Sequence, residues 1–236
     1  MATNHQTTNT ASSAGSASFD SLSKNLLTST TLTLPPGKPH DQTLTPTISS
    51  LSLHPALEAT LHMLNHDLPS AHFLVRHMQA PPALEGMLLH SILHRSEGDF
   101  RNARLWLSDV GDACEGWKPK KRDEGERLDD ETAEKCGCPR IEEGLVQWVY
   151  GAEGQKAGER LVDDVEGFRK RKGGEEEERR LVERIRDEMG KVMEWCVKKF
   201  GTQQYLDASS AWVKNSEEVQ KISNDMVSGG KGFRKF

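Results

Sequence analysis

At 236 residues, the chain is long enough for one domain with tails or for two small domains. Its residues are 35% hydrophobic and 28% charged, and no apolar run approaches the roughly 18 residues that span a membrane, so we expect a soluble protein without a membrane partner. The formal net charge of −5 comes without a strong basic face on any segment, which argues against a nucleic-acid partner.

Residues 1–50 are rich in serine and threonine and nearly free of charge. Such a composition buries little apolar surface, so we predict a disordered tail. One helical pattern within it begins at Ser18, a residue type that caps helices, and is expected to form a short docking helix. The apolar residues of that helix are Phe19, Leu22, Leu26 and Leu27.

Residues 54–111 contain an internal repeat with an offset of 32 residues. The matched pairs are Leu61 with Leu93, His62 with His94, Asp67 with Asp99 and Ala71 with Ala103. Each copy is predicted to be a helix, a short turn and a second helix, because its apolar residues recur at steps of three and four. The aspartate of each copy stands where it can cap the second helix. Turns this short make the two helices of a copy antiparallel neighbours.

These residues resemble the tetratricopeptide repeat over roughly residues 52–115. The segment GDFRNA, Gly98 to Ala103, is similar to the turn of that family, with its glycine, aspartate, aromatic residue and alanine. Ala59 and Ser91 stand where the family has a small residue on its first helix. The resemblance implies stacked helical hairpins with a groove that holds a partner segment. Large apolar residues are expected at four flanking positions, where this chain instead has Glu58, His62, His90 and His94.

The block LHSILHRSEGDFRNARLWLSDV, together with the ending SGGKGFRKF, also resembles a family of uncharacterised fungal proteins. This resemblance implies one soluble unit and carries over no site residue.

Four polar residues on the first helices of the repeat form a candidate site. Glu58 and His62 are four residues apart on one helix, and His90 and His94 are four apart on the other. This spacing places each pair on one helix face, and the repeat makes the two helices neighbours, so we expect the four side chains to converge. Three imidazoles and a carboxylate are a competent ligand set for zinc, iron or manganese.

The same four residues support three hypotheses. In the first, each histidine is structurally paired with a neighbouring carboxylate or carbonyl group. In the second, they line a groove for a peptide or ligand, with Arg95 available for an acidic group. In the third, they hold a divalent metal ion or act as an acid–base site. The first two hypotheses need no cofactor.

Residues near this set in the sequence have expected supporting roles. Glu97, Asp67 and Asp99 are candidate acceptors for the imidazole N–H groups. We interpret three further histidines as surface or cap residues: His66, His72 and His77.

Residues 112–139 break the helical pattern with a run of mixed charge, which predicts a long loop or linker. Cys136 and Cys138, with Cys114, invite a zinc site, but the single residue between the first two is too short for the common zinc ribbons. We therefore interpret them as exposed loop thiols. Cys196 lies in an apolar helix stripe and is expected to be an inert core thiol. With no disulfide framework and no secretory signal, we expect a reducing compartment, the cytoplasm or the nucleus.

Three helices are predicted after the loop, over residues 140–151, 155–171 and 175–200. The longest carries one apolar stripe and is expected to pack across the repeat helices and cap them. The stripe consists of Leu181, Ile185, Met189, Val192, Cys196 and Phe200. Residues 203–236 are predicted to be a C-terminal extension with one short helix, begun by Asn215.

The predicted organisation is therefore a disordered tail over 1–50, an all-α domain over 51–202 and an extension over 203–236. The domain is expected to consist of tetratricopeptide-like antiparallel hairpins capped by a long C-terminal helix. The predicted function is a binding or scaffold protein that holds a protein or peptide partner, or another ligand, in a groove between the repeat helices. The alternative is a metal-dependent enzyme that uses Glu58, His62, His90 and His94.

Overall fold

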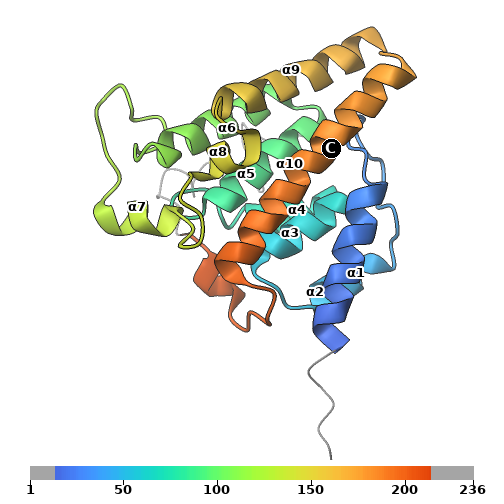
Figure 1. The fold of residues 1–236 in the computed structure, drawn as a ribbon, viewed down its shortest axis with the longest axis horizontal. Coiled ribbons are helices and arrows are strands. Elements are labelled where there is room, and N and C mark those ends of the chain that lie inside the picture. Colours follow the sequence, from blue (N-terminus) through green and yellow to red (C-terminus); the bar gives the residue numbers. More distant parts are fainter. Residues whose placement is uncertain (1–13, 214–236) are drawn as a thin grey trace, which may run out of the picture.

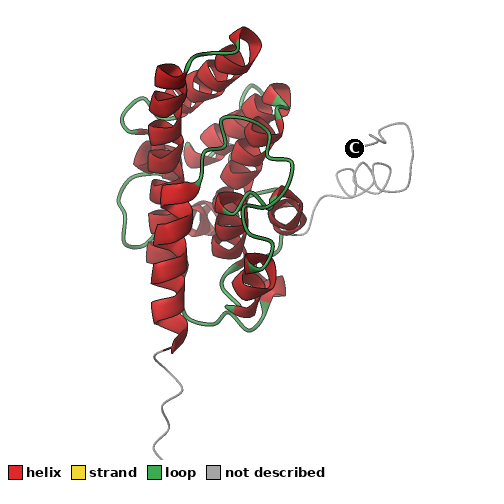
Figure 2. Ribbon diagram, turned by 90° about the vertical axis from the view of Figure 1, so that its right-hand side faces the viewer, coloured by secondary structure: helices red, strands yellow, loops and turns green. Residues whose placement is uncertain are grey.

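The computed structural model describes residues 14–213, which form ten α-helices, one short 3-10 helix and two isolated β-bridges (Figures 1 and 2). The predicted all-α class is confirmed for this part of the chain. None of its helices combines the length and apolar character needed to cross a membrane.

The amino-terminal segment is more ordered than expected. Two helices, α1 (Ala14–Ser29) and α2 (Leu44–Ser50), lie within the predicted tail of residues 1–50, and both pack on α3. The expected docking helix corresponds to α1, which buries Phe19 and Leu26. Leu32 and Ile48 are also fully buried. Disorder was therefore the wrong expectation for residues 14–50, because these few apolar side chains are covered by the rest of the domain.

The repeat region forms four helices: α3 (Pro55–Leu64), α4 (Leu68–Val75), α5 (Leu84–Glu97) and α6 (Phe100–Cys114). Helix α3 packs on α4, α4 on α5, and α5 on α6. Ala71 and Ala103 are fully buried where large side chains would keep the helices apart. The helices therefore follow one another in space in the order in which they occur in the chain.

The two turns of the repeat have nearly the same geometry. Asp67 has φ −86° and ψ 69°, and Asp99 has φ −86° and ψ 70°. The backbone N–H of Asp67 donates to the carbonyl of His62, and that of Asp99 donates to the carbonyl of His94, each at 2.8 Å. Each aspartate also accepts from the backbone N–H three residues on, at 3.3 and 3.2 Å. Both predicted caps are thus confirmed.

The remaining helices are α7 (Asp130–Cys136), α8 (Leu145–Tyr150), α9 (Gln155–Arg171), α10 (Glu175–Phe200) and the 3-10 helix η1 (Ala208–Ala211). Helix α10 crosses the molecule and packs on α1, α3, α8 and α9 (Figure 1). Its bounds match the prediction, whereas the helix expected over 140–151 is confined to α8. The helix expected at Asn215 lies outside the described residues.

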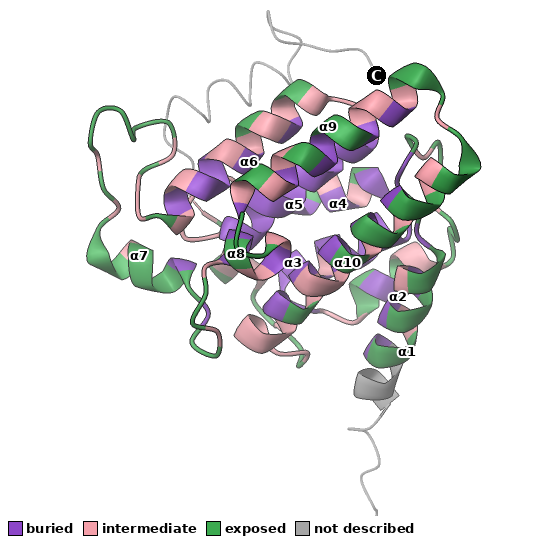
Figure 3. Cartoon of the chain, turned by 45° about the horizontal axis from the view of Figure 1, so that its top comes forward, coloured by how far each residue is buried: buried purple, intermediate pink, exposed green. Residues whose placement is uncertain are grey.

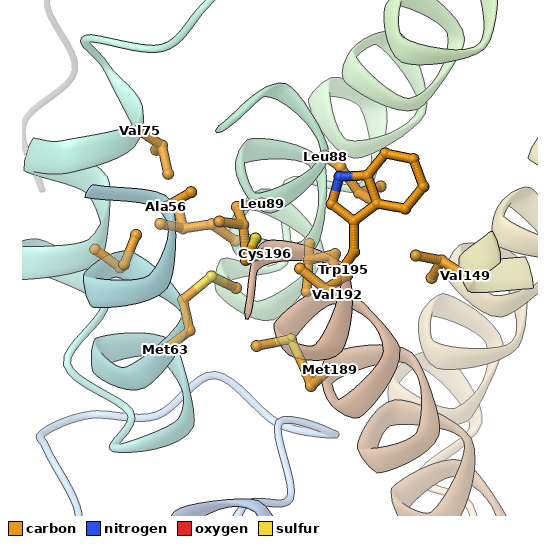
Figure 4. Packing of buried hydrophobic residues seen from close by; sticks show 14 of the residues in the cluster. Ala56, Met63, Val75, Leu88, Leu89, Val149, Met189, Val192, Trp195 and Cys196 are labelled. Carbon is orange, nitrogen blue, oxygen red and sulfur yellow. The ribbon is translucent and has the colours of Figure 1, made fainter. Parts of the chain in front are cut away.

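Helix α10 supplies much of the core. Its Met189, Val192, Trp195 and Cys196 are fully buried and face side chains of α3 and α5 such as Met63 and Leu88 (Figure 4). The faces of α3 and α5 are correspondingly buried, while α7 and the outer surface of α1 are exposed (Figure 3). Burial of Cys196 agrees with the expected core thiol.

The charged segment 112–139 is not a simple loop. Helix α6 continues into it as far as Cys114, and α7 forms within it. Cys136 and Cys138 are only 6% and 4% exposed, so the expectation of exposed thiols was wrong for both. Burial raises the pKa of the Cys136 thiol to about 12, which keeps it protonated and unreactive at neutral pH.

Candidate metal centre

Glu58 and His62, the first predicted pair, are held together inside the domain. His62 is 1% exposed, with its Nε2 atom 3.7 Å from Glu58 Oε1 and its Nδ1 atom 3.3 Å from Asp67 Oδ2. Asp67 also accepts a hydrogen bond from Thr45 Oγ at 2.7 Å. These carboxylates surround His62 with negative charge, and its side chain faces the α3–α4 turn.

His90 and His94, the second predicted pair, instead meet His72 of α4. The Nε2 atoms of His72 and His90 are 3.2 Å apart, and one ligand atom from each of the three imidazoles lies within 4.8 Å of the others. Glu58 and His62 do not belong to this group, which we call the three-histidine cluster. The expected convergence of all four residues was therefore wrong, and the interpretation of His72 as a surface or cap residue was also wrong.

Aromatic packing fixes the orientation of His90. Its ring is stacked between His94, with 4.8 Å between centroids, and Trp106 of α6, with 4.4 Å. His72 stands edge-on to both His90 and His94. The three rings therefore come from two adjacent helices, and a third helix supports them from behind.

Glu97, at the end of α5, contacts two of the imidazoles through their Nδ1 atoms. Its Oε1 is 3.4 Å from His72 Nδ1, and its Oε2 is 3.4 Å from His94 Nδ1. Burial alone would raise the pKa of Glu97, but the contacts with His72 and His94 outweigh it and lower the pKa to about 2. The carboxylate is therefore ionised, and it favours Nδ1 protonation, which leaves the Nε2 lone pairs of His72 and His94 free.

His90, the deepest of the three imidazoles, is favoured in its neutral form. Burial lowers the pKa of His90 well below its ordinary value, and the neighbouring charges of His94, His72 and Arg76 lower it further. The buried Nδ1 atoms of His90 and His94 have no partner in hydrogen-bond geometry. His94 Nδ1 is close enough to Glu97 for an ion pair but is not well aligned. The cluster is thus not a fully satisfied hydrogen-bond network.

Solvent reaches the cluster from one side. The side chains of His72 and His94 are 15% and 13% exposed, and that of Glu97 is 28% exposed. His90 lies deeper, at 3%. An ion or small ligand that approaches this face would meet His72 and His94 first.

Arg95 is not available for a ligand. Its side chain is 1% exposed and makes a bidentate ion pair with Glu188 of α10. The hydroxyl of Tyr150 donates to the same carboxylate at 2.7 Å. The expectation that Arg95 lines a groove was therefore wrong, because α10 covers this face of α5.

A signal for His72 existed in the sequence, although spacing on one helix could not reveal it. His72 lies on the second helix of the first copy, whereas the prediction used only the first helices. In a chain of antiparallel helices, the second helix of one hairpin packs against the first helix of the next, as α4 packs on α5. A comparison of the histidines on α4 and α5 would therefore have grouped His72 with His90 and His94.

Other features of the described residues do not form a comparable site. No group of three potential metal ligands in residues 14–213 includes a cysteine. A cleft of about 480 Å³ lies between α8, α9 and α10. Its charged rim is internally neutralised, for example by the ion pairs of Arg184 with Asp164 and of Lys191 with Asp187.

Comparison with known proteins adds no further constraint: no protein-family model, curated protein or solved structure matches the chain significantly. The functional argument therefore depends on the geometry of the site.

Proposed function

We propose that the protein binds a divalent transition-metal ion, with Zn²⁺ as the best fit, through the three-histidine cluster. The observation that carries the proposal is the convergence of His72, His90 and His94 in front of the Glu97 carboxylate. Imidazole nitrogen is a preferred ligand of Zn²⁺, and a carboxylate behind the ligating imidazole is its usual orienting partner.

The separation of the ligand atoms fits a tetrahedral ion. Zinc–nitrogen bonds of about 2.0 to 2.1 Å place two ligands of a tetrahedral site about 3.3 Å apart. His72 Nε2 and His90 Nε2 are already 3.2 Å apart. One ligand atom of His94 lies within 4.8 Å of those of His72 and His90, so all three imidazoles are near enough to share one ion after side-chain adjustment.

The distribution of protons over the three imidazole rings also supports an ion at this position. When the Nδ1–H groups of His72 and His94 are turned toward the Glu97 carboxylate, both rings present lone pairs at Nε2. The Nε2 atom of His90 faces the Nε2 atom of His72 at 3.2 Å and can donate one proton to it. A cation accepts all three lone pairs together, and the negative charge of Glu97 offsets part of its charge.

A tetrahedral ion held by these three histidines would keep a fourth position for water or a ligand. An open position on a three-histidine zinc site lowers the pKa of a bound water and polarises carbonyl groups. A metal-dependent enzyme therefore remains a candidate function. Its third imidazole would be His72 in place of His62, and its carboxylate would be Glu97 in place of Glu58.

The test is metal binding by protein purified without a histidine tag. We expect one Co²⁺ or Zn²⁺ per chain, with the visible absorption of tetrahedral Co²⁺. Replacing His72 or His90 by Asn should abolish the absorption while helicity is retained. His77→Asn is the matched control, because His77 is also on the surface of the α4 end but packs on Trp212 outside the cluster. Absence of stoichiometric metal in the wild type, or loss of the absorption in the control, would overturn the proposal.

A second candidate function is binding of a protein partner by a tetratricopeptide-like repeat. It is favoured by two apolar side chains at equivalent positions of the two copies, Phe73 on α4 and Leu105 on α6, which are 62% and 47% exposed. The matched turns at Asp67 and Asp99 support the repeat, and α10 would act as its cap. The partner would be an apolar segment on the outer face, since Arg95 on the face first considered is buried against α10.

The partner surface has its own test. The double variant Phe73→Ser with Leu105→Ser should lose a specific partner in cross-linking from cells of the natural source. Its metal stoichiometry should not change. Leu206→Ser is the control, because Leu206 is 89% exposed but lies outside the repeat. Equal partner recovery by the double variant and the wild type would contradict this function.

A further inference from the structure

We propose that the outer face of α4 is a docking site for the chain's own C-terminal segment, residues 215–227. The site is built around three aromatic side chains in contact, Phe73, His77 and Trp212, which we call the aromatic row. Docking of this segment does not require the metal ion proposed above.

The aromatic row is a continuous apolar surface in contact with water. The ring of Phe73 stands edge-on to that of His77, with 5.2 Å between centroids, and His77 is stacked on Trp212 at 4.4 Å. Phe73 is 62% exposed and Trp212 is 40% exposed, although both are large apolar side chains. Rings that are already held together lose little freedom when another segment covers them, so the burial of their exposed area favours docking.

The segment that follows α10 carries the chain to this row. Residues 201–213 are fixed to the repeat helices at two points. The backbone N–H of Tyr205 donates to the carbonyl of Ser52 at 2.7 Å, and that of Val213 donates to the carbonyl of His77 at 2.9 Å. Val213 is the last residue that the structure describes. The remainder of the chain therefore starts at the aromatic row itself.

The sequence of residues 215–227 suits such a surface. Val219, Ile222 and Met226 recur at steps of three and four, so the helix expected from Asn215 would carry them on one side. A single helix of this length is only marginally stable in water. Its apolar stripe therefore needs a surface to cover, and the aromatic row is the one at which the segment begins.

The lengths of the two elements match. Phe73 lies one turn before His77 on α4, about 6 Å along the helix axis. The chain from Val213 to Asn215 spans at most about 7 Å, and a helix beyond it advances about 1.5 Å per residue. The apolar stripe can therefore reach Phe73. A connection this short gives an effective concentration on the order of millimolar, so even a weak contact would keep the segment docked.

The charges of the two surfaces are opposite. Arg76 is exposed one turn after Phe73, on the same side of α4, and forms no ion pair within residues 14–213. The segment is acidic, because it has one lysine, Lys221, against three carboxylates. These are Glu217, Glu218 and Asp225. Attraction between the segment and Arg76 favours docking on this side of α4.

Docking of the segment would also regulate access to Phe73. The same side chain belongs to the surface that the second candidate function offers to a partner. A partner would have to displace the segment first, so the chain would restrain its own binding surface.

The experiment is limited trypsin digestion of the full chain, with cleavage after Lys221 followed by mass spectrometry. Cleavage tracks the population in which the segment is released. Phe73→Ser should therefore raise the cleavage rate at Lys221 by about tenfold, the protection expected for a weak contact at millimolar effective concentration. Leu34→Ser is the matched control on the domain, because Leu34 is also apolar and 55% exposed but lies between α1 and α2. It should be cleaved at the wild-type rate.

A second variant tests the segment from its own side. Met226→Ser removes one residue of the apolar stripe and should also raise the cleavage rate at Lys221. Asn224→Ser is its control, because position 224 falls on the opposite side of the expected helix and should leave the rate unchanged. Met226→Ser leaves residues 14–213 intact, so it decides the outcome even if circular dichroism shows that Phe73→Ser has lost helicity.

Two results would overturn the proposal. In the first, Lys221 is cleaved in the wild type as fast as in Met226→Ser and in a folded Phe73→Ser. In the second, protection of Lys221 increases with protein concentration, which would assign the aromatic row to a second copy of the chain. Metal binding is measured separately, so either result leaves the metal proposal standing.

Discussion

The Nε2 atoms of His72 and His90 face each other at 3.2 Å across the contact between α4 and α5. Eighteen residues separate the two histidines in the chain. Without a shared proton or ion, two imidazole lone pairs at this distance would repel each other. The contact therefore requires a defined protonation state or a metal, and both alternatives lead to measurements.

Replacing Glu97 by Gln tests the orientation of the imidazoles. The amide keeps the size of the side chain but loses the charge that attracts the Nδ1 protons of His72 and His94. We expect metal affinity to fall by about 10- to 100-fold, as is usual when a carboxylate that orients ligating imidazoles is lost. Competitive titration of Co²⁺ with a chelator measures the change. Glu58→Gln is the matched control and should leave affinity unaltered. A larger effect of Glu58→Gln would instead favour the site predicted from the sequence.

The buried ion pair of Arg95 and Glu188 should dominate the stability of the contact between α5 and α10. Glu188→Gln leaves the guanidinium without its counter-charge inside the core, and we expect a loss of about 3 to 5 kcal/mol in the free energy of unfolding. The double variant Arg95→Met with Glu188→Leu should be less destabilised than Glu188→Gln, because no buried charge remains. Urea denaturation followed by circular dichroism gives these values. Equal stability of Glu188→Gln and the wild type would show that the pair is solvated.

Gly86 should be essential for the close approach of α5 to the preceding loop. A Cβ atom added there would lie 2.2 Å from Met78 Cβ and 2.7 Å from the Met78 carbonyl oxygen. Because one of these obstacles is backbone, Gly86→Ala should destabilise the protein by about 1 to 3 kcal/mol or more. Gly190→Ala is the control within another helix, where the added atom meets only Leu27 at 3.5 Å. That variant should gain up to about 1 kcal/mol from helix propensity. Thermal unfolding of the two variants should therefore shift in opposite directions.

Mild acid should destabilise the fold through buried neutral histidines. Burial, and then the charge of Lys199, lowers the pKa of His54 from 6.5 to about 4. Burial, and then the charge of His40, lowers the pKa of His66 to about 4. The unfolded chain therefore binds more protons than the folded chain between pH 6.5 and 4, so stability is full above about pH 6.5 and falls as the pH decreases through this window.

Unfolding measurements at pH 7.5, 6 and 5 test this dependence. His54 is 7% exposed and alone should account for about 3 kcal/mol by pH 4, at about 1.4 kcal/mol for each pKa unit. His54→Asn keeps an acceptor at the start of α3, where His54 Nδ1 accepts from the N–H of Ala56, and should reduce the acid sensitivity. A stability that is constant between pH 7.5 and 5 would contradict the assignment of neutral histidines.

The sequence by itself determined the features that depend on local physics. The bounds of α9 and α10 follow from helical periodicity and flanking glycines, and the caps at Asp67 and Asp99 follow from side-chain chemistry at a helix start. The 32-residue offset also predicted two turns that share one geometry. Each of these depends on residues only a few positions apart, so spacing along the chain carries the information.

Only the tertiary structure decided which helix faces meet. The packing of the helices brings His72 next to His90 and His94, whereas Glu58 contacts only His62 of the predicted set. It also pairs Arg95 with Glu188, which is 93 residues away in the chain. It also brought α1 and α2 onto α3, although their own composition is poor in apolar residues. The physical reason is that a helical period fixes the side of a helix on which a residue lies, whereas the neighbour on that side is chosen by packing of the whole core.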